Sequence, residues 1–186
     1  MGTLRYITNV SLDGFIEDRN GEFAWSEPDD EVFAYTTDLL RPMALHLYGR
    51  RLYETMAVWE TDPSFAATSG LLAEFAAVWQ RGDKVVFSTS LAEPVTERTR
   101  IERRLDPDVV RDLKASADGD LFVGGADLAG QMLRAGLVDE IEWLVRPLLV
   151  GGGKPALPGI DRVDLDLVDE RRFAAGIVSL RYRVIT

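Results

Sequence analysis

The stretch from Leu121 to Gly136 constrains the fold more than any other part of the sequence. It reads Leu-Phe-Val-Gly-Gly-Ala-Asp-Leu-Ala-Gly-Gln-Met-Leu-Arg-Ala-Gly. An apolar run ends at Gly124 and Gly125, and helical spacing of apolar residues follows as far as Gly136, where a left-handed helix end favours glycine. The stretch therefore predicts a buried strand, a glycine turn and a helix, which together make one unit of an α/β protein.

The glycine pair in this stretch also predicts a place for an anion. A helix that begins directly after a strand presents unpaired backbone N–H groups and the positive end of its dipole. Glycines let a phosphate approach the backbone closely. On its own, the pair is equally well explained by an ordinary tight turn. The stretch is not the Gly-x-Gly-x-x-Gly fingerprint of dinucleotide-binding Rossmann domains.

Composition disfavours several classes of function. The chain has 186 residues and a formal net charge of −10, which makes nucleic acid and an anionic membrane surface poor partners. No apolar run approaches the roughly 20 residues of a membrane-spanning helix. Cys is absent and His46 is the single histidine, so we expect neither disulfides nor a His-rich metal site. We expect a cytoplasmic protein with one domain over residues 1–186.

Strand and helix patterns alternate along the chain. Strands are predicted at 4–10, 44–48, 84–88, 121–123, 140–146, 163–168 and 177–184, with a short edge strand at 99–103. Helices are predicted after Ser26-Glu-Pro-Asp29, which resembles a capping box, from Arg50 to Trp59, and from Ser69, Asp106 and Ala126. The segments 15–27 and 61–68 are predicted as loops. This alternation indicates a mostly parallel sheet covered on both faces, with the last two strands paired antiparallel.

Three predicted strand ends carry polar or glycine-rich residues. They are Gly49-Arg-Arg-Leu52, Ser88-Thr-Ser90 and the glycine pair. Ligands of open α/β sheets bind beyond the carboxyl ends of the strands, so we expect these segments to converge on one ligand. Paired arginines, hydroxyl groups and a helix end together predict a site for a ligand with at least two phosphates. Taken one at a time, each segment is also explained by a solvated helix start or a turn.

Six short motifs follow one another along the chain. They are Ser11-Leu-Asp-Gly14, Gly49-Arg-Arg-Leu-Tyr-Glu54, Val86-Phe-Ser-Thr-Ser-Leu91, Val123-Gly-Gly-Ala126, Val138-Asp-Glu-Ile141 and Pro147-Leu-Leu-Val-Gly-Gly-Gly153. In this order they resemble the dihydrofolate reductase-like superfamily. Within it, the chain looks most like stand-alone relatives of the reductase domain of bifunctional riboflavin-biosynthesis proteins. The resemblance spans nearly the whole chain and is carried by the ordered set of motifs.

The resemblance implies a fold, a cofactor and the residues that bind it. The fold would be a three-layer αβα sandwich on a mixed, mostly parallel sheet of about eight strands, and NADPH would be the hydride donor. Arg50 and Arg51 would contact the 2′-phosphate and pyrophosphate, helped by Ser88 and Thr89. The remaining cofactor-binding positions would be Gly49, Leu52, Gly124, Gly125 and Ala126, with Asn9 and Ile16 beside the nicotinamide. Many relatives have Thr where this chain has Leu52, which leaves only a backbone N–H there.

Asp30 and Trp25 are the residues expected on the substrate side. Dihydrofolate reductases carry a substrate-binding carboxylate at the position matching Asp30. A carboxylate there can accept two hydrogen bonds from an amidine-like edge of a pterin or pyrimidine and can help to deliver a proton. Alternatively Asp30 only complements the helix dipole, as Asp29 and Glu31 would. Trp25 would stack on a ligand or pin the 15–25 loop, which the resemblance makes a mobile lid.

The sequence therefore predicts an NADPH-dependent reductase of a small nitrogen heterocycle, of the ribosylaminopyrimidine or dihydrofolate type, without a metal. Asp30 is the catalytic candidate, the expected partner is a small-molecule substrate, and a homodimer is left open. One alternative is a nucleotide-binding module of the same fold without catalysis, for which Leu52 is mild support. A Rossmann-type NAD-dependent dehydrogenase is disfavoured by the missing fingerprint and the paired arginines.

Overall fold

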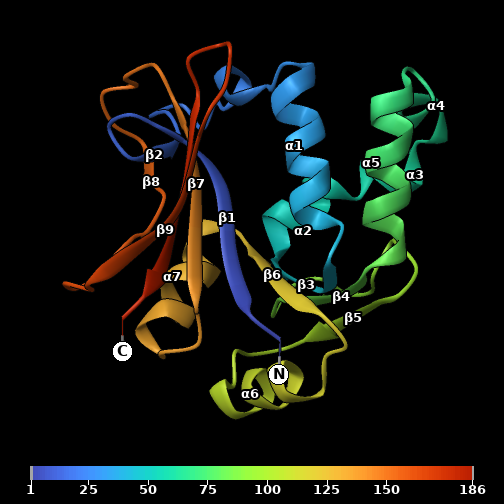
Figure 1. Cartoon of the computed structure of the whole chain (residues 1–186). Helices are drawn as coiled ribbons and strands as arrows, with labels where there is room; N and C mark the ends of the chain where they lie inside the picture. Colours follow the sequence, from blue (N-terminus) through green and yellow to red (C-terminus); the bar gives the residue numbers. More distant parts are fainter. Residues whose placement is uncertain (1, 186) are drawn as a thin grey trace.

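A central sheet organises the computed structural model, which describes residues 2–185 (Figure 1). Its strands are β1 Leu4–Ser11, β3 Met43–Gly49, β4 Asp83–Phe87, β5 Thr99–Glu102, β6 Asp120–Gly124, β7 Glu140–Arg146, β9 Leu165–Arg172 and β10 Val178–Val184. Their order is β5-β4-β3-β6-β1-β7-β10-β9. The six neighbouring strands from β5 to β7 in this order run parallel, whereas β10 is antiparallel to both β7 and β9. The predicted mixed, mostly parallel sheet of eight strands is confirmed, including the late antiparallel pair.

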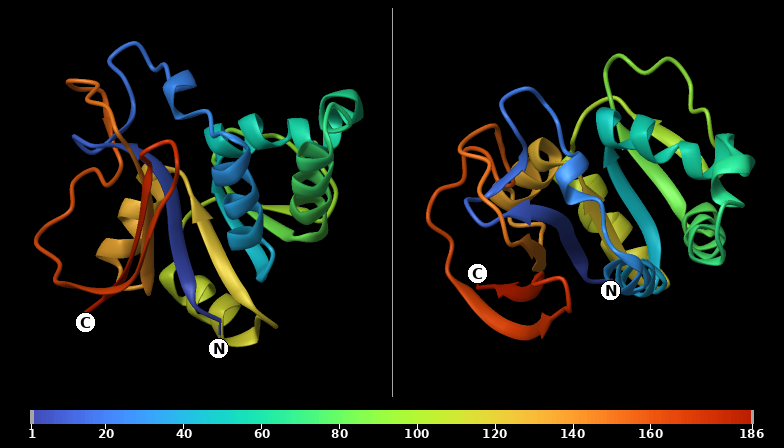
Figure 2. Two further views of the ribbon diagram at one scale, coloured as in Figure 1. Left: turned by 45° about the horizontal axis from the view of Figure 1, so that its top comes forward. Right: turned by 90° about the horizontal axis from the view of Figure 1, so that it is seen from above.

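Helices cover both faces of the sheet, as Figure 2 shows from two further directions. They are α1 Asp30–Leu40, α2 Arg50–Met56, α3 Val58–Thr61, α4 Pro63–Ala66, α5 Gly70–Arg81, α6 Pro107–Ser116 and α7 Ala126–Arg134. One apolar core, which includes Val32 and Trp79, lies under α1 and α5. A second core, which includes Val110 and Met132, lies under α6 and α7 on the other face. These layers form the expected αβα sandwich.

The predicted helix from Arg50 to Trp59 is wrong in its extent, because α2 ends at Met56 and α3 begins at Val58. Tyr53 and Trp59 are both buried in the same core. In one continuous helix, six residues of separation would place them about 120° apart around the axis. The break between the two helices therefore lets both aromatic side chains face the core.

Two further predictions are wrong, one about a loop and one about the start of a helix. The segment 61–68 is not all loop, since Pro63 begins α4 and the Asp62 carboxylate accepts a hydrogen bond from the Phe65 N–H at 3.1 Å. Helix α1 is capped by Asp29, which accepts from the Val32 N–H at 2.9 Å, rather than by Ser26. Ser26 instead ends a short 3₁₀ turn, η1 (Ala24–Ser26).

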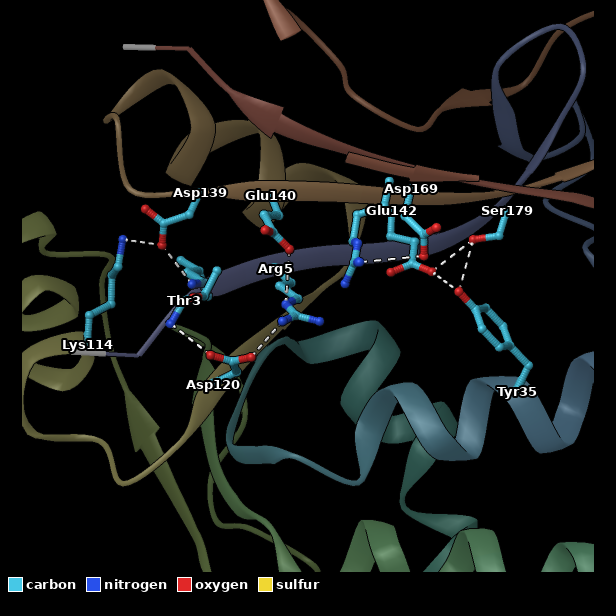
Figure 3. A network of polar contacts seen from close by, with 12 residues as sticks. Thr3, Arg5, Tyr35, Lys114, Asp120, Asp139, Glu140, Glu142, Asp169 and Ser179 are labelled. Atoms are coloured by element: carbon cyan, nitrogen blue, oxygen red, sulfur yellow. Dashed lines mark hydrogen bonds and ion pairs between the residues drawn. The ribbon is translucent and has the colours of Figure 1, made fainter. Parts of the chain in front are cut away.

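A partly buried polar layer ties α1 to the sheet (Figure 3). The Tyr35 hydroxyl on α1 donates to Glu142 Oε1 on β7 at 2.6 Å, and the Ser179 hydroxyl on β10 donates to the same oxygen at 2.8 Å. Further along the same face of the sheet, Arg5 pairs with Asp120 at 2.8 Å. Burial and the bond to Glu142 raise the pKa of Tyr35 to about 12. These contacts hold α1, and the residues at its start, in a fixed position over β7.

Candidate functional site

The three predicted strand ends meet at one cavity of about 500 Å³, which we call the basic cavity. It lies beyond the carboxyl ends of β3, β4, β5 and β6, which are neighbours in the parallel part of the sheet. Most of the residues predicted to bind the cofactor line it, namely Gly49, Arg50, Arg51, Leu52, Ser88, Thr89, Gly125 and Ala126. The parallel sheet thus brings together segments that are far apart in the sequence.

The basic cavity is positively charged in a protein whose formal net charge is −10. Its lining carries one acid, Asp127, and five basic side chains, which are Arg50, Arg51, Arg103, Arg104 and Lys154. Such a local reversal of charge favours an anionic ligand.

Sequence reasoning missed Arg103, Arg104 and Lys154. The two arginines follow edge strand β5 directly, so the strand-end rule that selected the other segments could have found them. Lys154 lies in β8 (Lys154–Pro155), which pairs with β2 (Phe15–Glu17). Its place at this cavity depends on that pairing, which no local pattern indicates.

The arginines of the basic cavity differ in how free they are. Arg50 pairs with Glu54, one turn further along α2, at 3.0 Å. Arg103 donates to the backbone carbonyls of the loop that follows β4, and so braces that loop. Within residues 2–185, the guanidinium groups of Arg51 and Arg104 make no hydrogen bond or ion pair to the protein. Arg51 and Arg104 are therefore the cations most available to a ligand.

Gly124 and Gly125 are glycines for different reasons. Gly125 has φ +98°, a conformation that side chains rarely adopt, and it directly precedes α7. A Cβ built on Gly125 would have Gly49 N as its nearest neighbour, at 3.8 Å, so the space beside it is open. A Cβ on Gly124 would lie 2.5 Å from Leu52 Cδ2 and 2.9 Å from the Phe122 ring. Gly125 thus leaves room for a ligand, whereas Gly124 leaves room for Leu52.

A second cavity of about 680 Å³, which we call the aromatic cavity, lies beside α1. Its walls come from η1, from helices α1 to α5, and from strands β1, β3, β6 and β7 of the sheet. Asn9 and Asp30, both predicted as site residues, line it, and Leu52 lines both cavities. Leu52 is therefore the shared wall between a basic compartment and a largely apolar one.

The three acids at the start of α1 have three different roles. Asp29 caps the helix. Glu31 accepts from the Ala174 N–H at 3.1 Å and pairs with Arg171 at 3.6 Å. Asp30 lies on the same side of the helix as Phe33 and lines the aromatic cavity with it. The local sequence could not separate these acids, because the helix dipole favours all three equally.

Arg146 supports the rim of the aromatic cavity, and sequence reasoning missed it. This nearly buried arginine, at the end of β7, donates to Asn9 Oδ1 at 3.0 Å and to the backbone carbonyls of Ser26 and Glu27. Because a guanidinium only donates, it must face the oxygen of the Asn9 amide, which leaves the Asn9 NH₂ group to donate into the cavity. Holding the two carbonyls also explains why α1 does not begin at Ser26.

The structure does not bring Trp25 and Ile16 to either cavity. The Trp25 indole N–H donates to the Glu22 carbonyl at 3.1 Å, so Trp25 braces its own loop. Ile16 lies in β2, which pairs with β8. Asp13 joins the start of this loop to a second loop, since its carboxylate accepts from the Gly151 N–H at 2.7 Å. The predicted roles of Trp25 and Ile16 would need a different loop conformation and stay predictions.

His46 is fully buried and lies outside both cavities. The Tyr48 hydroxyl lies 3.2 Å from His46 Nδ1 and accepts from the Trp79 indole N–H at 2.9 Å. Burial, and next the charge of Lys84, lower the pKa of His46 to about 3. Residues 2–185 contain no group of three or more His, Cys, Asp or Glu side chains placed to hold a metal ion. Among the same residues, no helix has the length and apolar character that a membrane span requires.

Comparison with known proteins identifies relatives of the whole chain. Residues 3–179 match the family described as the RibD C-terminal domain. Uncharacterized protein YyaP of Bacillus subtilis (strain 168) is 30% identical over 178 residues, which cover 93% of this chain and 90% of that protein.

Solved structures with similar folds have low sequence identity. A putative riboflavin biosynthesis protein from Shewanella sp. PV-4 superposes with a TM-score of 0.77 at 18% identity, over 99% of both chains. A diaminohydroxyphosphoribosylaminopyrimidine deaminase/5-amino-6-(5-phosphoribosylamino)uracil reductase from Thermotoga maritima gives 0.65 at 16% identity, where this chain spans 57% of that protein. These likenesses agree on the fold, and the sequence match over residues 3–179 shows that the chain belongs to the RibD C-terminal domain family.

Proposed function

We propose that the protein is an NADPH-dependent reductase of a small nitrogen heterocycle. The observation that carries this proposal is the pair of adjoining cavities, one basic and one aromatic, with Leu52 as their shared wall. A dinucleotide phosphate needs cations and free N–H groups, whereas a heterocycle needs flat apolar walls and a few polar groups. The reductase named in the Thermotoga maritima relative supports the same class of reaction.

The residues of the basic cavity fit NADPH. Arg51 and Arg104 would hold the 2′-phosphate together with the hydroxyls of Ser88 and Thr89. The pyrophosphate would lie against Gly125 and the first N–H groups of α7, where no Cβ intrudes. When bound, the nicotinamide supplies a hydride.

Two residues of the aromatic cavity would act on the other reactant. The Asn9 NH₂ group, held by Arg146, would donate to a carbonyl oxygen of the cofactor or substrate. Asp30 would bind a protonated or N–H-rich edge of the heterocycle and relay a proton to it, with water as the source.

The test begins with the cofactor alone. Calorimetric titration should give at least tenfold tighter binding of NADPH than of NADH. Each charge-assisted contact contributes about 1.5–3 kcal/mol, so Arg51→Ala and Arg104→Ala should each weaken NADPH roughly 10- to 150-fold and change NADH little. Arg50→Ala should have a smaller effect, because Arg50 is paired with Glu54. Arg111→Ala, which removes an exposed arginine of α6 outside both cavities, is the control.

Turnover is then measured as NADPH oxidation in the presence of pterins, dihydrofolate and ribosylaminopyrimidines. Equal affinity for the two cofactors would remove the assignment of the 2′-phosphate site. Tight NADPH binding without oxidation by any heterocycle would instead favour a nucleotide-binding module.

A further inference from the structure

The aromatic cavity has a negatively charged lining, although one solved protein of similar fold is named as the reductase of a substrate that carries a phosphate. Among residues 2–185, no Lys, Arg or His lines it. Its two charged side chains are the carboxylates of Glu27 and Asp30. A phosphate monoester carries close to two negative charges at neutral pH and requires cations or several N–H donors. The lining supplies repulsion where such a ligand needs attraction.

Arg146, which lies behind the rim, does not change this balance. Its Nη atoms donate to Asn9 Oδ1, to the Ser26 carbonyl and to the Glu27 carbonyl, and its side chain is nearly buried. A phosphate could recruit this guanidinium only by breaking the contacts that shape the start of α1. The five basic side chains of the basic cavity lie on the other side of Leu52.

The end of the cavity away from β1 is built for an apolar group. The Trp59 ring centroid lies 4.5 Å from that of Phe75, 5.2 Å from that of Phe65 and 6.0 Å from that of Phe33. Phe65 remains 40% exposed, so this cluster opens to solvent. A ribose phosphate would leave its polar groups unpaired against these rings. An aryl or alkyl substituent would bury them.

From this charge and shape we propose that the substrate is an unphosphorylated nitrogen heterocycle, with a cationic or N–H-rich edge at Asp30 and an apolar substituent among Phe33, Trp59 and Phe65. This inference rests on the proposed function and narrows it. A carboxylate accepts two parallel hydrogen bonds from an amidine-like edge, and the bond is stronger when that edge is protonated. On this inference, the phosphoribosylamino pyrimidine named for the Thermotoga maritima protein is not the preferred substrate.

The inference is tested by binding, with and without saturating NADPH. One pair of probes differs only in phosphate: a ribosylaminopyrimidine nucleoside and its 5′-phosphate. A third probe, a 2,4-diaminopyrimidine with a 5-aryl group, carries both the amidine-like edge and the apolar substituent. Calorimetry should show that the aryl diaminopyrimidine binds at least tenfold tighter than the 5′-phosphate, and that the phosphate group does not strengthen binding of the nucleoside. Tighter binding of the 5′-phosphate, or binding of none of the probes, overturns the inference.

Two variants locate the effect. Asp30→Asn should weaken the aryl diaminopyrimidine at least tenfold while leaving NADPH affinity intact. Asp38→Asn makes the same change of charge on an exposed residue of α1 outside the cavity and should change neither ligand more than about twofold, as expected for a screened surface charge. Equal effects of the two variants would contradict direct contact with Asp30. Phe65→Ser should weaken the 5-aryl compound more than the unsubstituted diaminopyrimidine; equal weakening would contradict the apolar subsite.

Failure of this inference and failure of the proposed function give different results. Absence of NADPH binding removes the proposed function, while the probes still report on the aromatic cavity in the cofactor-free protein. Tight NADPH binding together with a preference for the 5′-phosphate keeps the reductase and overturns only the substrate class.

Discussion

His46 makes the stability of this protein depend on pH in a way that can be calculated. It is the single histidine of the chain, and burial lowers its pKa from 6.5 to about 3. Well above pH 6.5 the side chain is neutral in both the folded and the unfolded state, so it causes no pH dependence. Between pH 6.5 and 3 the unfolded state binds a proton that the folded state excludes. Stability contributed by this residue is therefore lost as the pH falls through this window.

The size of the effect follows from the same two pKa values. Lowering the pH from 8 to 5.5 stabilises the unfolded state relative to the folded state by about 1.4 kcal/mol, because a proton binds to the unfolded histidine, whose pKa is 6.5. Carboxylates titrate at lower pH and add their own dependence, so the comparison needs a variant. His46→Gln keeps a side-chain hydrogen-bonding group for the Tyr48 hydroxyl and has no titrating group.

Urea unfolding at pH 8 and pH 5.5 measures the effect directly. The wild type should lose about 1.4 kcal/mol more than His46→Gln between these two values. Because only one histidine is present, its ring protons give one set of NMR signals, which should not shift with pH between 8 and 5. Parallel stability profiles for the two proteins, or a titration near pH 6.5 in the folded state, would refute the reasoning.

The remaining predictions concern the two cavities. Gly125→Val should weaken NADPH binding at least tenfold. Gly136 also has a positive φ but lies at the other end of α7, so Gly136→Val should lower the free energy of unfolding by roughly 1–3 kcal/mol, as Gly125→Val should, and leave NADPH binding intact. Gly124→Ala should cost about 1–3 kcal/mol of unfolding free energy, and Leu52→Ala in the same chain should recover part of it. Arg146→Met should speed amide hydrogen exchange in the segment before α1, since it removes charged hydrogen bonds contributing about 1.5–3 kcal/mol each; unchanged exchange would contradict its bracing role.

Several elements follow from local sequence alone. The strand Glu140–Arg146 is found at the residues where it is predicted. The helix that begins at Ala126 is marked by glycine before it and by apolar spacing within it. Boundaries were less predictable where a distant group intervened. Arg146 holds the carbonyls of Ser26 and Glu27, and a capping pattern that looks complete locally is therefore not used.

The candidate site shows the same division. Gly49, Ser88 and Gly125 could be predicted to converge, because the carboxyl ends of parallel strands meet at one edge of a sheet. Lys154 could not be predicted, since its place in the basic cavity depends on the pairing of β8 with β2 and on an ion pair with Asp127 at 2.8 Å. Trp25 carries an aromatic ring suited to stacking, yet its indole braces its own loop.

The sequence by itself determined the alternation of strands and helices, the family, and three strand ends that are predicted to bind an anion. These depend on periodicity, on residue type and on the ends of strands, all of which are local. Only the tertiary structure decided how charge is divided between the two cavities and which acid of Asp29, Asp30 and Glu31 faces one of them. That choice depends on the rotation of α1, to which the partly buried contact between Tyr35 and Glu142 contributes together with the buried Val32 and Leu40. A contact between residues 107 positions apart in the sequence leaves no pattern in either segment.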